Sequence, residues 1–233
     1  MQFTAIASSS KGNAYVVKSI GIAPLLVEAG VPISKLREST GFGLSSLAGC
    51  LISHEHGDHS KAVNDLLKAG VDCYMSHGTA KALEIEYHHR VCILRANVAQ
   101  AIQKWTILSF SLHHDSADPI GFLVAHGDER LLFIPDTGFI SNRFAGVTIA
   151  AVECNFLSEQ LSENIRNGSL PAVTGRRIRR NHMSLNTLIE MLKANDLSKC
   201  RAIHLLHLSD GNSYEGRMIK EVQKATGIPT YAA

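Results

Sequence analysis

Short apolar segments rich in β-branched residues alternate along the chain with stretches of helical periodicity. Apolar runs of this length, bounded by Gly, Ser or Pro, predict β-strands. We expect strands at residues 2–7, 14–19, 24–29, 48–53, 105–112, 120–126, 130–135, 148–153 and 201–208. Strands dominate the first part and the middle, and helices come late. This order predicts an α/β (α+β) fold of two sheets with helices on their outer faces.

Three segments have the apolar spacing of helices. Residues 58–69 carry one apolar stripe, residues 181–195 form a strongly amphipathic pattern, and residues 214–226 form a closing helix. No repeat, low-complexity tract or linker interrupts the pattern. We therefore expect a single domain over residues 1–233.

Composition changes this picture little. The chain has 233 residues, of which 45% are hydrophobic and 19% charged, and a net charge of +2. The number of apolar residues is sufficient for one sizeable hydrophobic core. So small a net charge does not by itself indicate a nucleic-acid-binding protein. No apolar run approaches the ~18 residues that span a bilayer.

Cysteine usage bears on the compartment. The five cysteines are widely spaced, odd in number and lack a C-x-x-C pair. This is typical of reduced thiols rather than of a disulfide framework. The start of the chain shows no basic segment followed by a long apolar stretch, so we expect no signal peptide and a cytoplasmic location.

The histidines are the main candidates for metal ligands. Four ligand-type residues fall within six positions directly after the strand at 48–53, in the order H-x-H-x-D-H: His54, His56, Asp58 and His59. Alternate residues at a strand end point the same way, so His54 and His56 can grip one cation. After Gly57, Asp58 and His59 can face a second. Imidazole and carboxylate suit Zn²⁺, and also Mn²⁺ or Fe²⁺.

Four groups cannot complete two sites, so later segments must contribute. Three qualify, each at a strand end: His113 or His114, then Asp136, then His207. An Asp between two cations can bridge them with its two oxygens, which suits Asp136.

These motifs together resemble the metallo-β-lactamase superfamily. SHEHGDHS is followed by a strand-end His, a strand-end Asp and a late strand-end His. SSSKGNAYVV, HDSADPIGF, PDTGFI, ECNF, GRRIRRNHMS and LLHLSDGNS resemble its WalJ/YycJ-type exonuclease branch, which is related in layout to ribonuclease Z and phosphodiesterases. The resemblance implies an αββα sandwich with two divalent metal ions, Zn²⁺ foremost, at one rim.

The resemblance also implies the distribution of ligands. One metal would be held by His54, His56 and His114, because the branch pattern H-D-x-x-D-P-x-G starts at His114. The other would be held by Asp58, His59 and His207, with Asp136 bridging.

Two acids are expected to support the ligands rather than bind metal. The family usually has Asp where this chain has Glu28, which can still orient a histidine. Glu153 is expected to be a buried acid in the same network.

Three features favour a phosphodiester substrate, cleaved by a metal-bridging hydroxide. His182, at the expected start of the helix at 181–195, can donate a proton to the leaving oxygen, as the resemblance to ribonuclease Z implies. Just before it, Arg176, Arg177, Arg179 and Arg180 can hold a phosphate backbone. The lactamase-type G-H-T-P-G-S pattern is absent. Asp58 and His182 are the expected catalytic residues.

Three functions stay open. The first is a dinuclear-metal phosphodiesterase or nuclease acting on DNA or RNA. The second is a hydrolase of small esters, thioesters or lactams. The third is a metal-bearing binding or regulatory protein without catalysis. Membrane attachment is not expected, and homo-oligomer formation stays open.

Overall fold

Apolar strands of three to seven residues form most of the scaffold in the computed structural model, which describes residues 1–41 and 43–233. The chain divides into two compact units. Unit 1 comprises Met1–Ser111 and Ser116–Glu129, and unit 2 comprises Leu112–Asp115 and Arg130–Ala233. A single domain over residues 1–233 remains a prediction.

Unit 1 contains a six-stranded mixed sheet with the strands in sequence order. Its strands are β1 (Gln2–Ala7), β2 (Ala14–Lys18), β3 (Leu25–Val27), β4 (Gly49–Leu51), β5 (Cys73–Met75) and β6 (Val91–Ile93). The first two pairings are antiparallel, and those from β3 to β6 are parallel. Parallel neighbours bring the ends of β3 and β4 to one edge, and the loop that follows β4 carries the histidine motif.

Helices and an antiparallel meander complete unit 1. The helices are α1 (Ile33–Ser39), α2 (Gly57–Ser60), α3 (Val63–Lys68) and α4 (His77–Ala82), with a 3₁₀ turn η1 (Leu44–Ser46). The meander strands are β7 (Ala99–Ile102), β8 (Trp105–Ser111) and β9 (Ile120–His126). The only tryptophan of the chain, Trp105, is buried and donates its indole N–H to the Ala23 carbonyl at 2.8 Å.

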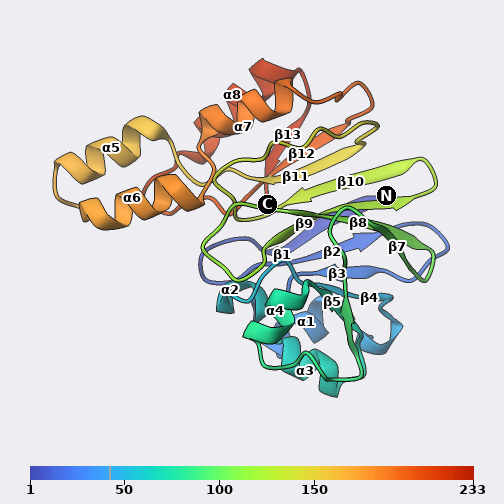
Figure 1. Cartoon of the computed structure of the whole chain (residues 1–233). Helices are drawn as coiled ribbons and strands as arrows, with labels where there is room; N and C mark the ends of the chain where they lie inside the picture. The colour runs from blue at the N-terminus through green and yellow to red at the C-terminus, as the bar shows by residue number, and fades with distance from the viewer. Residues whose placement is uncertain (42) are drawn as a thin grey trace. The chain divides into compact units, whose positions relative to one another are not determined.

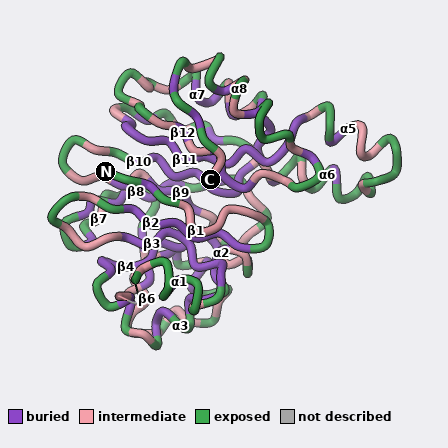
Figure 2. The backbone as a smooth tube through the Cα atoms, turned by 180° about the vertical axis from the view of Figure 1, so that it is seen from behind, coloured by how far each residue is buried: buried purple, intermediate pink, exposed green. Residues whose placement is uncertain are grey.

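Parallel strands form the centre of unit 2. They are β10 (Glu129–Ile134, its first residue in unit 1), β11 (Ile149–Glu153), β12 (Ala202–Leu206) and β13 (Thr230–Ala232). The helices are α5 (Ser158–Arg166), α6 (Ala172–Asn181), α7 (Leu185–Lys193) and α8 (Glu215–Thr226). Helices α5 and α6 lie side by side, as do α7 and α8 (Figure 1). All five residues of β11 are buried, as expected of a strand covered on both faces (Figure 2).

The nine strands expected from the sequence are present, but two helix predictions need correction. Residues 58–69 form two short helices rather than one, and Ala62 at the break donates its N–H to Ala29 across the unit. The helix expected at 181–195 begins at Leu185, where the Ser184 hydroxyl caps it by accepting the Thr187 N–H. The arginine run before it is itself helical, in α6.

No helix within residues 1–41 and 43–233 is long and apolar enough to cross a membrane.

Gly30 allows the chain after β3 to pass directly against the histidine loop. A β-carbon at Gly30 would overlap the carbonyl of Asp58. That carbonyl accepts the Asn13 N–H at 2.8 Å, and the Gly30 N–H donates to the Asn13 carbonyl at 2.9 Å. Close backbone approach is a role that only glycine fills without displacement.

We predict that Gly30→Ala lowers the free energy of unfolding by about 1–3 kcal/mol, because the added methyl must push the Asp58 backbone away. Urea unfolding followed by Trp105 fluorescence measures this. The matched control is Gly216→Ala, at an exposed position in α8 with open space around it, which should be neutral or slightly stabilising. Equal unfolding midpoints for Gly30→Ala and the parent would show that the close approach is not needed.

Candidate metal centre

The histidine motif forms one compact cluster in unit 1. It follows β4, and Asp58 and His59 lie in the first turn of α2. The His54 ring centroid is 4.8 Å from that of His56 and 4.1 Å from that of His59. His54 and His59 are buried, and His56 and Asp58 are half-buried. The strand end therefore brings the four predicted ligands of this unit together.

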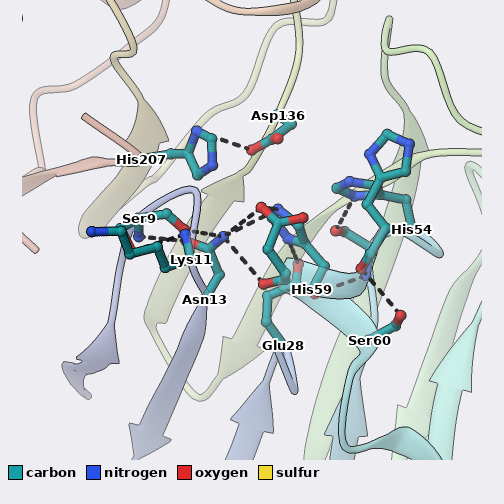
Figure 3. A network of polar contacts seen from close by, with 12 residues as sticks. Ser9, Lys11, Asn13, Glu28, His54, His59, Ser60, Asp136 and His207 are labelled. Atoms are coloured by element: carbon teal, nitrogen blue, oxygen red, sulfur yellow. Dashed lines mark hydrogen bonds and ion pairs between the residues drawn. The ribbon is translucent and has the colours of Figure 1, made fainter. Parts of the chain in front are cut away.

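Polar side chains lie beside two rings of this cluster. The Ser53 hydroxyl lies 2.8 Å from His54 Nδ1. Glu28 Oε1 lies 3.6 Å from His59 Nδ1 (Figure 3). Glu28 is fully buried with a φ of 63°, a strained value for a residue other than glycine. Its other oxygen accepts the Ser53 N–H at 3.4 Å. Glu28 thus contacts both the loop and one ring of the cluster, the position expected of a supporting acid.

Asn13 belongs to the same network, although its sequence context indicates only a polar turn. Its side-chain amide nitrogen lies 3.0 Å from the Ser9 carbonyl, 3.3 Å from the Asp58 carbonyl and 3.2 Å from His59 Nε2. Asn13 is buried, and its side-chain oxygen accepts the Tyr15 hydroxyl at 3.1 Å. No local motif marks such a role, because the contacts span more than forty residues.

A second cluster of ligand-type residues lies in unit 2. Asp136 follows β10 and His207 follows β12. His114 Nε2 is 3.8 Å from Asp136 Oδ2. His207 Nδ1 is 3.8 Å from Asp136 Oδ1 (Figure 3). His207 has a φ of 54°, so this ligand position also stands on a strained backbone.

Glu153, the last residue of β11, connects the parts of the unit 2 cluster. Its carboxylate lies 2.5 Å from His182 Nδ1 and 3.6 Å from His207 Nδ1. It also accepts the backbone N–H groups of Thr137 at 2.9 Å and Met183 at 3.0 Å. Together these groups compensate the desolvation of a fully buried acid.

The pKa values follow from these contacts. Burial alone would raise the pKa of Glu153, but the charge of His182 and hydrogen bonds from His182 and His207 lower it overall. Burial alone would lower the pKa of His182, but the charge and hydrogen bond of Glu153 raise it. Burial lowers the pKa of His114. The contacts with His182 and His207 therefore favour the anionic form of Glu153.

The two candidate histidines at 113 and 114 have different surroundings. His114 donates its Nδ1–H to the Asn181 carbonyl at 3.0 Å, and its Nε2 is on the Asp136 side. His113 instead stacks on Phe139, with ring centroids 4.0 Å apart. Within unit 2, His114 rather than His113 lies beside the other ligand-type residues.

His182 does not begin a helix, contrary to expectation. It is an extended residue between α6 and α7, and its Nδ1 lies 3.9 Å from Asp136 Oδ2. The cap of α7 is instead Ser184, whose hydroxyl accepts the Thr187 N–H.

Three of the four arginines in α6 line one cavity. This cavity of 460 Å³ is lined by Asp115, Arg176, Arg177, Arg180 and Asn181. Arg177 pairs with Asp115 at 2.7 Å. Arg179 does not line the cavity, because its guanidinium donates to the Ser162 hydroxyl of α5 at 2.7 Å.

The donor atoms of both clusters suit a divalent cation. Within unit 2, Asp136, Glu153, His182 and His207 each offer one ligand atom, and these four atoms lie within 4.8 Å of one another. Buried imidazoles with carboxylates, each oriented by a hydrogen-bond partner, are the usual surroundings of Zn²⁺ and related ions. Ser53, Asn155 and Asn181 supply such partners and have no sequence signal. Asn155 donates its side-chain amide to His207 at the ring and at the carbonyl.

Comparisons with known proteins agree with this donor chemistry. The model of the family described as "Beta-lactamase superfamily domain" matches residues 29–207. Exodeoxyribonuclease WalJ from Streptococcus pneumoniae serotype 2 is 28% identical over 97% of this chain and 87% of its own.

Solved structures share the fold. The metallo-β-lactamase fold protein YhfI from Bacillus subtilis aligns over 99% of this chain and 95% of its own, with a TM-score of 0.76 at 16% identity. The short form of human tRNase Z aligns over 90% of this chain and 93% of its own, with a TM-score of 0.60 at 14% identity.

These matches confirm both the predicted resemblance and the predicted fold, two mixed sheets with flanking helices. The His and Asp clusters are consistent with the dinuclear metal site typical of that fold. The chain belongs to the β-lactamase superfamily, as a metal-dependent hydrolase of the metallo-β-lactamase fold.

Proposed function

We propose that the protein is a dinuclear-metal phosphodiesterase that cleaves single-stranded DNA or RNA, most simply at the ends of the strand. The observation that carries this proposal is a proton-donor pair beside a basic cavity in the same unit. His182 and Glu153 are joined at 2.5 Å, and His182 follows directly after the α6 residues that line the cavity. The name of the relative WalJ, an exodeoxyribonuclease, supports the same substrate class.

The proposed ligands come from both clusters. His54, His56 and His114 would hold one cation, Asp58, His59 and His207 the other, and Asp136 would bridge them. His54 and His114 have partners at Nδ1, which favours Nε2 as the metal-binding nitrogen. When bound, two such cations activate water for attack on phosphorus and stabilise charge on the phosphate oxygens.

The role of His182 in this proposal follows from its contacts. Glu153 fixes one ring nitrogen through the 2.5 Å contact, which orients the ring and favours its protonated form. The other nitrogen can then donate a proton to the leaving alkoxide oxygen. Glu153 acts through His182 and is therefore a positioning residue.

The basic cavity would hold the phosphates next to the scissile bond. Arg176 and Arg180 are exposed and lie four residues apart on one face of α6. Within residues 1–41 and 43–233, neither guanidinium forms an ion pair with a carboxylate. Two such charges are suited to a phosphate backbone.

We predict that the purified protein binds about two Zn²⁺ or Mn²⁺ ions per chain, the number that a two-metal hydrolase requires. Asp136→Asn should bind fewer, because a bridging ligand is lost, whereas Asp196→Asn, an exposed Asp of the same unit, should bind as many as the parent. Elemental analysis after gel filtration gives the count. A parent that retains no metal, or an unchanged count for Asp136→Asn, would refute the assignment.

We predict that His182→Ala lowers kcat on single-stranded DNA by about 10²- to 10⁴-fold. On bis-p-nitrophenyl phosphate the loss should be much smaller, because p-nitrophenolate leaves without a proton. His89→Ala, at an exposed histidine of unit 1, is the control and should match the parent on both substrates. Equal losses on the two substrates would show that His182 does not protonate the leaving group.

We predict that the double variant Arg176→Ala, Arg180→Ala binds single strands more weakly and with less salt dependence. The slope of log K against log salt concentration should fall by about 0.7 for each lost phosphate contact. Fluorescence anisotropy with a labelled oligonucleotide, in the slowly cleaving His182→Ala background, measures this slope. Arg179→Ala, whose guanidinium bonds to Ser162, should leave it unchanged. A double variant with the parental slope would rule out phosphate contacts here.

A further inference from the structure

An exposed aromatic pair lies in unit 2 outside the proposed chemistry. Phe139 is 49% exposed, and its ring stacks on exposed His113 with centroids 4.0 Å apart and planes 13° apart. A large apolar ring in water needs a reason, because burial of such a ring would stabilise the fold. His113 supports one edge of the stack, and Phe139 still offers accessible surface.

The backbone holds this pair rigidly. The hydroxyl of buried Thr137 accepts the His113 N–H at 3.0 Å and donates to the Phe139 carbonyl at 2.8 Å. The Gly138 N–H donates to the His113 carbonyl at 2.9 Å. A β-carbon at Gly138 would overlap the carbonyl of Arg180, so this glycine lets the loop lie directly against the end of α6.

Phe139 lines two cavities. One, of 280 Å³, is lined by His113, His114, Phe139, Arg180 and Asn181 together with Leu112. The other, of 230 Å³, is lined by Phe139, Ile140 and Arg143 with Glu190 and other residues of α7 and its C-terminal end. Each cavity that Phe139 lines therefore also contains one arginine.

This combination has the chemistry of a single-strand binding path. Bases stack on exposed aromatic rings, and arginines beside the rings contact the phosphates that precede and follow each base. A small-molecule ester offers no repeated anion to match an arginine in each cavity. Asp136, the proposed bridging ligand, precedes Phe139 by three residues in the same tight loop, so a base on Phe139 would belong to a nucleotide next to the scissile phosphate.

We propose that Phe139, supported by His113, is a stacking platform for the substrate nucleobase adjacent to the cleaved bond. This inference rests on the proposed function and adds to it a binding subsite and a requirement. A base must be unpaired to stack on a side chain, so the platform selects single strands and frayed ends over intact duplex.

The test uses the metal-loaded protein and a set of oligonucleotides in which one nucleotide at a time is replaced by an abasic analogue. The parent should show a rise in KM of about 5- to 100-fold when the missing base is the one that stacks. Phe139→Ala should lose this position-specific preference, and Phe139→Trp should restore it. Quenching of 2-aminopurine fluorescence at that position should likewise need an aromatic residue at 139.

Tyr231→Ala provides the matched control, because Tyr231 is 52% exposed and pairs with His204 elsewhere in unit 2. It should keep the parental preference. If the parent cleaves no oligonucleotide, the proposed function itself fails. If the parent cleaves DNA or RNA but Phe139→Ala retains the same abasic preference and the same quenching, only the stacking platform is overturned.

Discussion

The desolvation of two glutamates is the constraint on which both clusters depend. Glu28 after β3 and Glu153 at the end of β11 are each fully buried, and a buried carboxylate costs several kcal/mol unless donors surround it. Around Glu153 these donors are backbone N–H groups and the His182 ring. Glu28 accepts the Ser53 N–H at 3.4 Å, and the His59 ring lies 3.6 Å from its other oxygen, beyond hydrogen-bond distance. The need to satisfy Glu153 therefore fixes the His182 ring, and Glu28 leaves one oxygen directed toward the His59 ring. Rings held beside buried acids in this way are oriented before a cation binds.

One short loop of unit 2 contains both a proposed metal ligand and the proposed substrate-binding ring. In this loop, residues 136–139, Asp136 offers oxygens for the proposed metal site and Phe139 offers its ring for stacking. The Thr137 hydroxyl hydrogen-bonds to the backbone of both His113 and Phe139. The N–H of Thr137 is held by Glu153. A change that shifts this acid is therefore transmitted through one short, hydrogen-bonded segment to the proton donor, the metal ligand and the aromatic surface alike.

The sequence predicts those elements well whose hydrophobic pattern lies within one short segment. The expected strands are present because short apolar runs between turn residues are themselves typical of strands. The four residues of H-x-H-x-D-H lie close together because the motif directly follows a strand. The sequence predicts less where tertiary contacts determine the local structure. The helix expected at 58–69 breaks because the Ala62 N–H bonds to Ala29, and Asn13 joins the cluster only through contacts with a loop far along the chain. Arg179 differs from the other three arginines through its contact with Ser162 of α5, which the order of residues in the sequence does not reveal.

Anomalous diffraction from crystals of the metal-loaded protein, collected on both sides of the absorption edge of the bound metal, would locate the metal ions. We predict two anomalous peaks per chain, one about 2.0–2.1 Å from nitrogens of His54 and His56 and one at a similar distance from His59 and His207, with Asp136 reaching both. Peaks that lie away from these histidines, or well-ordered crystals at saturating metal with no peak at them, would contradict this prediction.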